Sequence, residues 1–268
     1  MASRKPHPSL QPYVRRYVGW FEHMAAPLCR RELPTDEVPV IVSFGAPIRI
    51  YDAGDSGRSS VRKSFATGAY DSYVRVLSSG PSGGVQIDFS LLGARLFLNR
   101  PLDALRNRSV PLEDVLGPLA GRLTDMLQDA PDWDARFVIL DREIGTRFRA
   151  ARTPPAQVTW AWRRIVGSSG RIDIARIVEE VGWSQRHLIT RFRSDIGLSP
   201  KTMARVMRFA RAARLLRLPV RPDLSSVAFD CGYYDQSHFT RDFRAFAGVT
   251  PGELIESVLP DNGGIIAE

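Results

Sequence analysis

The spacing of apolar and polar positions divides the chain into a strand-rich first part and a helical last part. In roughly the first hundred residues, β-branched and aromatic runs alternate with clusters of Gly, Pro, Asp and Ser, which is typical of short strands joined by turns. The predicted strands are 38–44, 48–51, 73–77 and 85–89, and the predicted turns are 45–47, 52–57 and 78–84. Many short strands of this kind predict a small barrel or sandwich.

Two predicted helices follow these strands. Apolar residues recur with a period of about 3.6 residues at 111–130, behind Pro111, and again at 132–149, behind Asp132. The two apolar stripes fit either packing onto the chain's own sheet or a homodimer interface. Both arrangements stay open from the sequence.

A pair of prolines marks the predicted boundary between two domains. Pro154 and Pro155 cannot continue a helix. We therefore expect an α+β fold with a β-rich N-terminal domain and helices at 1–150, a Pro-containing linker at 151–156, an all-α domain at 157–257 and a tail at 258–268. Residues 260–268 are expected to be unstructured.

The last part of the chain contains the same helical pattern twice. Helices are predicted at 158–166, 173–181, 184–196, 201–218, 224–230 and 235–247. Aligned on Gln185 and Gln236, which are 51 positions apart, the copies match at His187/His238, Leu188/Phe239 and Phe192/Phe243. An apolar pair at i, i+4 among polar residues predicts a short helix with one buried stripe and one exposed face.

Each copy has the layout of a helix-turn-helix. A short helix ends at glycine, a tight turn follows, and a second helix begins at a capping Ser184 or Asp235. In that geometry the second helix enters the major groove of DNA. The outward positions are Gln185, Arg186, Ile189, Thr190 and Arg193 in the first copy, and Gln236, Ser237, Thr240, Arg241 and Arg244 in the second.

The chemistry of these outward faces is suited to reading bases. Arginine pairs with the O6 and N7 atoms of guanine, and glutamine pairs with the N6 and N7 atoms of adenine. The predicted helix 201–218 between the copies would span roughly 27 Å. The two reading helices could then enter groove segments about one turn of DNA, roughly 34 Å, apart.

Composition adds a basic charge and a compartment. The formal net charge is +8, and arginine supplies nearly all of the positive charge, which suits contact with phosphates and base edges. Cys29 and Cys231 lie far apart, which indicates no disulfide framework. Neither a signal peptide nor an apolar run of roughly 20 residues is recognised, so we expect a cytoplasmic protein without a membrane segment.

The second copy, 232–244 with 248–251, resembles the signature of AraC/XylS-type transcriptional regulators. The first copy, with Ser184, Leu188, Phe192, Gly197 and Ser199-Pro200, fits the other motif of the same family, so that the resemblance covers residues 156–257. It implies a bihelical double-stranded-DNA-binding domain in an activator or repressor, often with a small-molecule effector, and RNA polymerase as a partner of an activator.

The resemblance also implies site residues. Groove-facing positions of the family correspond to Gln185, Arg186, Ile189 and Thr190, and to Gln236, Ser237, His238 and Arg241. Ile189 departs from the pattern, because it cannot hydrogen-bond a base and could contact only a thymine methyl group.

The N-terminal part bears a loose likeness to the β-rich sensing domains of this family. Aromatic and arginine side chains there could form an effector pocket, in which an arginine receives an anionic group. The candidates are Trp20, Phe44, Arg49, Tyr51 and Arg75. The alternative is that most of these aromatic residues belong to the core.

Two other classes of function compete with a regulator. The first is a small-molecule-modifying enzyme with an appended DNA-binding domain. The four histidines form no HxH or HExxH motif, so that no catalytic residue, metal site or cofactor is predicted. The second is an architectural DNA binder without sequence preference.

Overall fold

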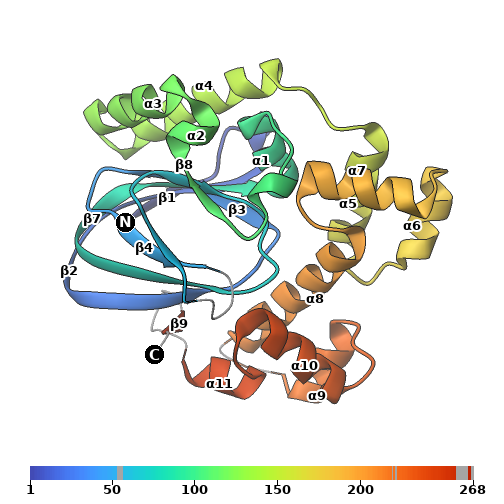
Figure 1. Cartoon of the computed structure of the whole chain (residues 1–268). Helices are drawn as coiled ribbons and strands as arrows, with labels where there is room; N and C mark the ends of the chain where they lie inside the picture. The colour runs from blue at the N-terminus through green and yellow to red at the C-terminus, as the bar shows by residue number, and fades with distance from the viewer. Residues whose placement is uncertain (53–56, 219, 221, 258–264, 267–268) are drawn as a thin grey trace.

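The computed structural model describes residues 1–52, 57–218, 220, 222–257 and 265–266. Its N-terminal part is a curved antiparallel sheet with helices packed against it, and its C-terminal part is helical (Figure 1). This arrangement confirms the predicted fold class. The four residues 53–56 of the predicted turn 52–57 lie outside the described residues.

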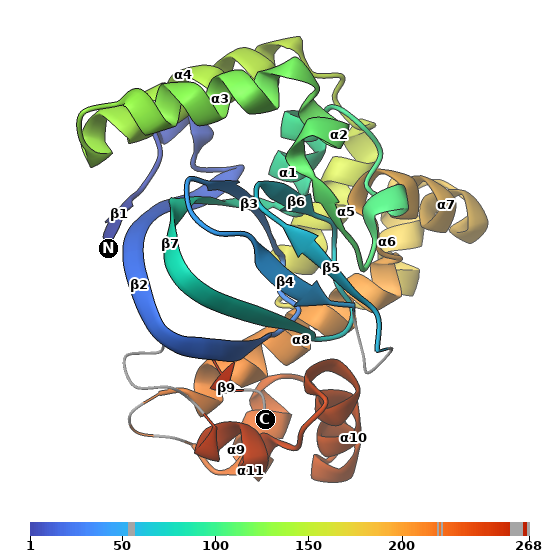
Figure 2. The same cartoon turned by 60° about the vertical axis from the view of Figure 1, so that its left-hand side comes forward.

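The sheet is built around two long strands, which curve strongly (Figure 2). The order is β1-β2-β7-β3-β6-β8, with β4 placed between β5 and β7 and with β9 on β2. All pairs in the described residues are antiparallel. The strands are β1 Ala2–Arg4, β2 Val14–Glu32, β3 Glu37–Ser43, β4 Ile48–Tyr51, β5 Ser59–Arg62, β6 Phe65–Thr67, β7 Val74–Ser90, β8 Ser109–Pro111 and β9 Ile265–Ile266.

The prediction of separate strands at 73–77 and 85–89 is wrong, because both belong to β7. The segment 78–84, predicted as a turn, continues the strand and pairs with β2. Its glycines permit close contact with neighbouring strands: a Cβ on Gly84 would lie 2.5 Å from the carbonyl oxygen of Val42, and one on Gly83 would lie 2.6 Å from the Phe21 ring. Strand β2 was not predicted either.

The N-terminal helices are α1 Leu91–Leu98, α2 Leu112–Leu116, α3 Pro118–Asp129 and α4 Trp133–Ala150. Helix α4 confirms the helix predicted at 132–149, whereas the one predicted at 111–130 is interrupted at Gly117, whose φ is +58°. The apolar positions of α3 and α4, which include Leu123, Leu127 and Leu140, are buried in the core. Packing onto the chain's own sheet therefore accounts for both stripes.

The C-terminal helices follow the prediction closely. They are α5 Ala156–Gly167, α6 Ile174–Val181, α7 Gln185–Ile196, α8 Pro200–Leu216, α9 Leu224–Asp230, α10 Gln236–Ala247 and, not predicted, α11 Pro251–Glu256. The expectation of an unstructured tail is wrong at Ile265–Ile266, which pair with Arg31 and Arg30 of β2. The rest of the tail lies outside the described residues.

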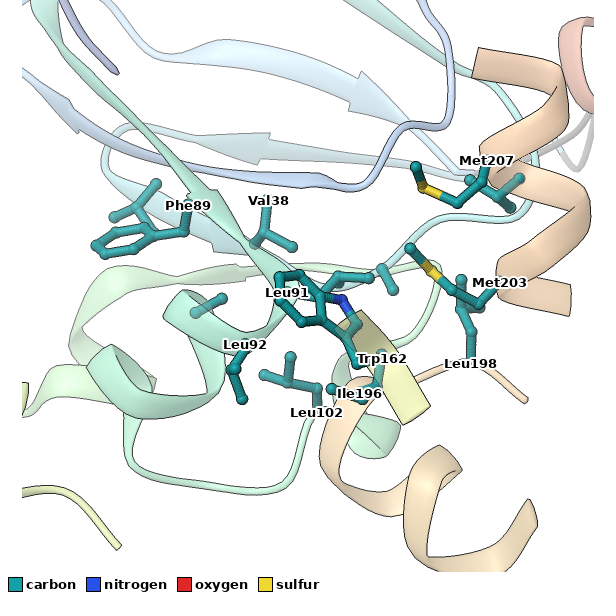
Figure 3. Close-up of a cluster of buried hydrophobic side chains, with 14 of the residues drawn as sticks. Val38, Phe89, Leu91, Leu92, Leu102, Trp162, Ile196, Leu198, Met203 and Met207 are labelled. Atoms are coloured by element: carbon teal, nitrogen blue, oxygen red, sulfur yellow. The ribbon is translucent and has the colours of Figure 1, made fainter. Parts of the chain in front are cut away.

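One hydrophobic core runs through both parts of the chain. Figure 3 shows this core where the N-terminal and C-terminal parts meet. Leu91 and Leu92 of α1 lie near Trp162 of α5, and Met203 and Met207 of α8 extend the same cluster. A smaller cluster, Ile41, Ile50 and Phe65, packs with Trp20, Ile48 and Val76. The helical C-terminal part is thus joined to the N-terminal part by shared apolar packing.

Candidate nucleic-acid interface

The first helix-turn-helix unit consists of α6, a short turn and α7. Gly182 ends α6 with φ +71°, and its N–H donates to the carbonyls of Val178 and Glu179. The hydroxyl of Ser184 caps α7 by accepting from the N–H of His187 at 3.3 Å. Leu188 and Phe192 are fully buried, so that the opposite face of α7 is left to solvent.

The second unit repeats this construction with α9 and α10. Gly232, with φ +77°, follows α9, and the Asp235 carboxylate caps α10 by accepting from the N–H of His238 at 2.6 Å. Phe239 and Phe243 are fully buried. Both predicted helix-turn-helix units are therefore present, with reading helices that start at the predicted caps.

Most of the predicted reading residues lie on the exposed faces of these two helices. Exposed positions are Gln185, Arg186, Ile189, Thr190 and Arg193 on α7, and Gln236, Ser237, Arg241 and Arg244 on α10, whereas Thr240 and His238 are half-buried. The Thr190 hydroxyl donates to the Arg186 carbonyl of its own helix, and Gln236 Oε1 accepts from the Ser225 hydroxyl. The amide of Gln236 is thereby held at the start of α10.

Arginine serves two different purposes in this domain. Arg205 of α8 binds the buried Asp242 of α10 through two hydrogen bonds, and the Asp242 carboxylate raises the pKa of Arg205. Within the described part of the chain, by contrast, no carboxylate pairs with Arg186, Arg193 or Arg241. The charges of these three arginines on the exposed faces of α7 and α10 are therefore not neutralised by ion pairs within the described part of the chain.

The residue after each turn glycine fixes a histidine ring. The Trp183 ring meets the His187 ring edge-on with centroids 4.5 Å apart, and Tyr233 meets His238 in the same way at 5.4 Å. The resemblance implied that His238 faces the groove, but its ring packs in part against Tyr233. Its contribution to the site is in part structural.

The second turn contains one residue more than the first, and this residue is a candidate that the sequence reasoning missed. Tyr234 lies directly before the cap of α10 and is 93 % exposed. On the first unit, Lys201 at the start of α8 lines a groove of about 330 Å³ together with Gln185 and Ile189. Comparison of the two turns in the sequence could have identified Tyr234, because the turn between Gly182 and Ser184 is one residue shorter than the turn between Gly232 and Asp235.

Helix α8 connects the two units. Its 17 residues correspond to roughly 26 Å at the usual rise of a helix. The first unit lies near its start and the second packs on its later part, where Phe209 meets Phe243 and Phe246 at 4.9 and 5.1 Å (Figure 1). Two exposed basic helices are thus carried by one connecting helix.

The five residues predicted for an effector pocket do not come together at one site, although Tyr51 and Arg75 are in contact. Trp20 packs with Ile48 and Ile50, and because side chains alternate along a strand, Arg49 and Tyr51 of β4 point to the other face. The Arg75 guanidinium lies over the Tyr51 ring at 5.0 Å. Only Phe44 of the five lines the groove of about 420 Å³ that Phe21, Glu22, His23 and Pro81 help to form.

Metal-binding clusters and membrane-spanning helices are both absent from the described residues. In that part of the chain, no three His, Cys, Asp or Glu side chains come together in a way that could hold a metal ion. None of its helices combines the length and the apolar character needed to cross a membrane.

Comparison with known families matches two separate segments of the chain. Residues 177–257 match a family described as a helix-turn-helix domain, and residues 2–111 match a domain of unknown function (DUF6597). The F1 operon positive regulatory protein of Yersinia pestis is 38 % identical over 80 residues, which are 30 % of this chain and 26 % of that protein.

Other relatives give a consistent picture. The HTH-type transcriptional regulator MtrA of Neisseria gonorrhoeae is 32 % identical over 82 residues, or 30 % of this chain and 27 % of that protein. The chain thus matches about a quarter of the length of these curated relatives. A crystal structure of apo ToxT from Vibrio cholerae covers 94 % of this chain and 99 % of its own, with a TM-score of 0.50 and 12 % identity, a likeness that concerns the fold.

Proposed function

Residues 177–257 of this chain are an AraC-type helix-turn-helix domain, and from that premise we propose that the protein is a sequence-specific transcriptional regulator. It reads two adjacent major-groove segments of DNA with α7 and α10, and it activates or represses genes near its site. The observation that carries this proposal is the pair of capped helices at the two ends of α8, each with a buried stripe and an exposed polar face.

The exposed side chains support direct reading of bases. Gln185, Arg186 and Ile189 occupy the first turns of α7, and Gln236, Ser237 and Arg241 occupy the matching part of α10. Recognition helices present their N-terminal residues to base edges in the major groove. Arg186 and Arg241 are assigned to guanine edges, and Ile189 to a thymine methyl group.

Selection of genomic DNA fragments by the full-length protein at physiological salt tests this function. We expect a motif of two blocks about one helical turn apart. Arg186→Ala and Arg241→Ala should each weaken binding to this motif by about 1–3 kcal/mol and relax the sequence preference in one block. Arg122→Ala, which removes an exposed arginine of α3, serves as the matched control and should leave the motif unchanged.

The outcome separates the proposal from its rivals. Equal loss of affinity for the selected and for scrambled DNA would reassign the two arginines to phosphate contacts. Binding without any enriched motif would select the architectural DNA binder. Turnover of a small molecule by the full chain would favour the enzyme with an appended DNA-binding domain.

We also propose that a small, largely apolar effector binds the N-terminal part, in the groove between Phe21 and Phe44. The two rings lie 6.1 Å apart, and Phe21 is 60 % exposed, although a large side chain of this kind is normally buried. A fluorescent anilinonaphthalene dye provides a probe. Phe21→Ser should abolish dye binding, whereas Val138→Ser on α4, which changes an equally exposed residue (58 %), should retain it. Equal binding by both variants would exclude the groove.

A homodimer remains a separate proposal. The buried stripes of α3 and α4 are used within the chain, so that a dimer would need other surfaces of these helices. Sedimentation of the full chain at micromolar concentration gives the answer directly, because a monomer there would exclude a stable dimer.

A further inference from the structure

The loop Gly68–Tyr73, between β6 and β7, contacts the ends of both reading helices. Gly197 ends α7 and Gly248 ends α10, both with positive φ, at corresponding positions of the repeat. A Cβ on Gly197 would lie 3.4 Å from Ala69 Cβ, and one on Gly248 would lie only 2.3 Å from the Tyr73 ring. One loop of the N-terminal part therefore packs against equivalent points of two units.

Arg31 strengthens the contact between Tyr73 and the second unit through two interactions. The Arg31 guanidinium of β2 lies over the Tyr73 ring at 4.8 Å. The same arginine donates from Nη1 to the Ala247 carbonyl at 3.2 Å, one of the carbonyls that a helix end leaves without an intrahelical partner. Tyr73 and Arg31 thus contact each other, and both contact the C-terminal end of α10.

The contact with the first unit is held by its neighbours in the N-terminal part. The N–H of Leu102 donates to the Ser194 carbonyl in the last turn of α7 at 2.9 Å. Leu102 also packs on Gly197, where a Cβ would lie 3.2 Å from the Leu102 carbonyl oxygen. The end of α7 therefore has a fixed place relative to the loop.

The loop itself is stiffened by hydrogen bonds to the segment 106–108. Backbone bonds join Gly68 to Arg108 and Asn107 to Ala69, each at 3.0 Å. The side chain of Asn107 accepts from the N–H of Asp71 and donates to its carboxylate, which also binds Arg106. Asn107 adopts φ +54°, a conformation that asparagine tolerates better than most residues. A loop held in this way can keep the ends of α7 and α10 at a fixed distance from each other.

These contacts lie at the ends of the helices that are remote from DNA in the proposed function. The reading residues occupy the first turns of α7 and α10, whereas the loop touches the glycines that follow their last turns. The loop can therefore hold both helices without covering the faces that read bases.

We propose that the loop Gly68–Tyr73 is a positioning element that sets the spacing between the two DNA blocks the protein recognises. This inference rests on the proposed function of α7 and α10. One base pair advances the groove by about 3.4 Å and rotates it by roughly 35°, so that a rigid pair of readers accepts one spacing and rejects its neighbours. Loosening the loop should reduce the discrimination against altered spacers more than it reduces the affinity of either helix for its own DNA block.

The test uses the two-block DNA selected by the wild-type protein, with the spacer unchanged, shortened or lengthened by one base pair. For full-length wild type, we expect binding to the altered spacers to be weaker by about tenfold or more. Tyr73→Ala should reduce this ratio to about twofold. Tyr73→Phe, which keeps the ring against Gly248 and Arg31, should retain the wild-type ratio.

A second variant leaves both helix ends untouched. Asn107→Gly permits the positive φ and removes only the side-chain bonds to Asp71, so it should lower the spacing ratio even where Tyr73→Ala fails to fold. Both variants should bind single-block DNA like wild type.

Two outcomes distinguish the inference from the function on which it rests. If wild type selects no two-block motif, the proposed function fails, and this inference fails with it. If wild type selects such a motif and both variants keep the full spacing ratio, only the inference is refuted, and α8 alone sets the spacing.

Discussion

The ion pair between Arg95 and Asp195 offers the sharpest test of how the two parts of the chain are joined. Arg95 on α1 donates from Nε to Asp195 on α7 at 3.0 Å, and the two side chains are only 8 % and 6 % exposed. In the described residues, Arg95 Nη1 and Asp195 Oδ2 have no hydrogen-bond partner. Each charge therefore depends on the other for nearly all of its compensation.

The expected magnitude follows from this burial. Removing one partner leaves an uncompensated charge in the core, which costs about 3–5 kcal/mol. For a chain of this size, each kcal/mol lowers the melting temperature by roughly 2–4 °C, so that Arg95→Met or Asp195→Ala should lower it by about 6–20 °C. The double variant buries no charge and should be more stable than either single variant.

Thermal and urea unfolding of wild type, the two single variants and the double variant measure these differences. The pair Arg176–Glu180 on α6 has a similar N···O distance of 2.8 Å, but Arg176 is 67 % exposed, so Arg176→Ala should cost no more than about 0.5 kcal/mol. Losses that add up in the Arg95→Met/Asp195→Ala variant would refute the reasoning. Single-variant losses as small as that of Arg176→Ala would refute it as well.

Three further predictions concern other parts of the chain. Burial raises the pKa of the Cys231 thiol to about 11, so a maleimide at pH 8 should label the half-buried Cys29 and spare Cys231; labelling of both before unfolding, read by mass spectrometry, would contradict this. Gly248→Ala and Gly182→Ala share the cost of a left-handed backbone, about 1–2 kcal/mol, but Gly248→Ala should lower the melting temperature more because its Cβ meets Tyr73. Burial, with Asp88 and Asp36 nearby, raises the pKa of Glu37, so the folded chain holds this proton more tightly than the unfolded chain and loses stability as the pH rises past the ordinary carboxyl range. Glu37→Gln should therefore stabilise at pH 7 by about 0.5 kcal/mol or less, with the gain lost at acidic pH; an equal gain at both pH values would contradict it.

The helical part was predictable because its signals are local. The N-caps Asp173, Ser184 and Asp235 each accept a backbone N–H within three residues, and Gly182 and Gly197 end their helices with positive φ. Such caps involve only residues that are close in the sequence. The outward faces followed from the same local periodicity.

The N-terminal part was less predictable because its signals are not local. Helix α1 is buried along all eight residues, so it shows no alternation of polar and apolar positions. The glycines at 80, 83 and 84 indicated a turn, whereas Gly83 and Gly84 permit the close packing of β7 against Phe21 and Val42. The five predicted effector residues do not share one site for a related reason: which face of β4 a residue occupies depends on strand pairing.

The unequal attachment of the two units follows from one difference within the repeat. Where the second unit has Phe246, packed 5.1 Å from Phe209 of α8, the first has Asp195, which cannot join an apolar core without a partner. That partner is Arg95 of the N-terminal part, so a buried ion pair ties the first reader to the N-terminal part, whereas the matching residue of the second packs on α8. A conformational change in the N-terminal part would therefore act on α7 through the Arg95–Asp195 pair. It would act on α10 through α8 and through the contact of Tyr73 and Arg31 with the end of α10.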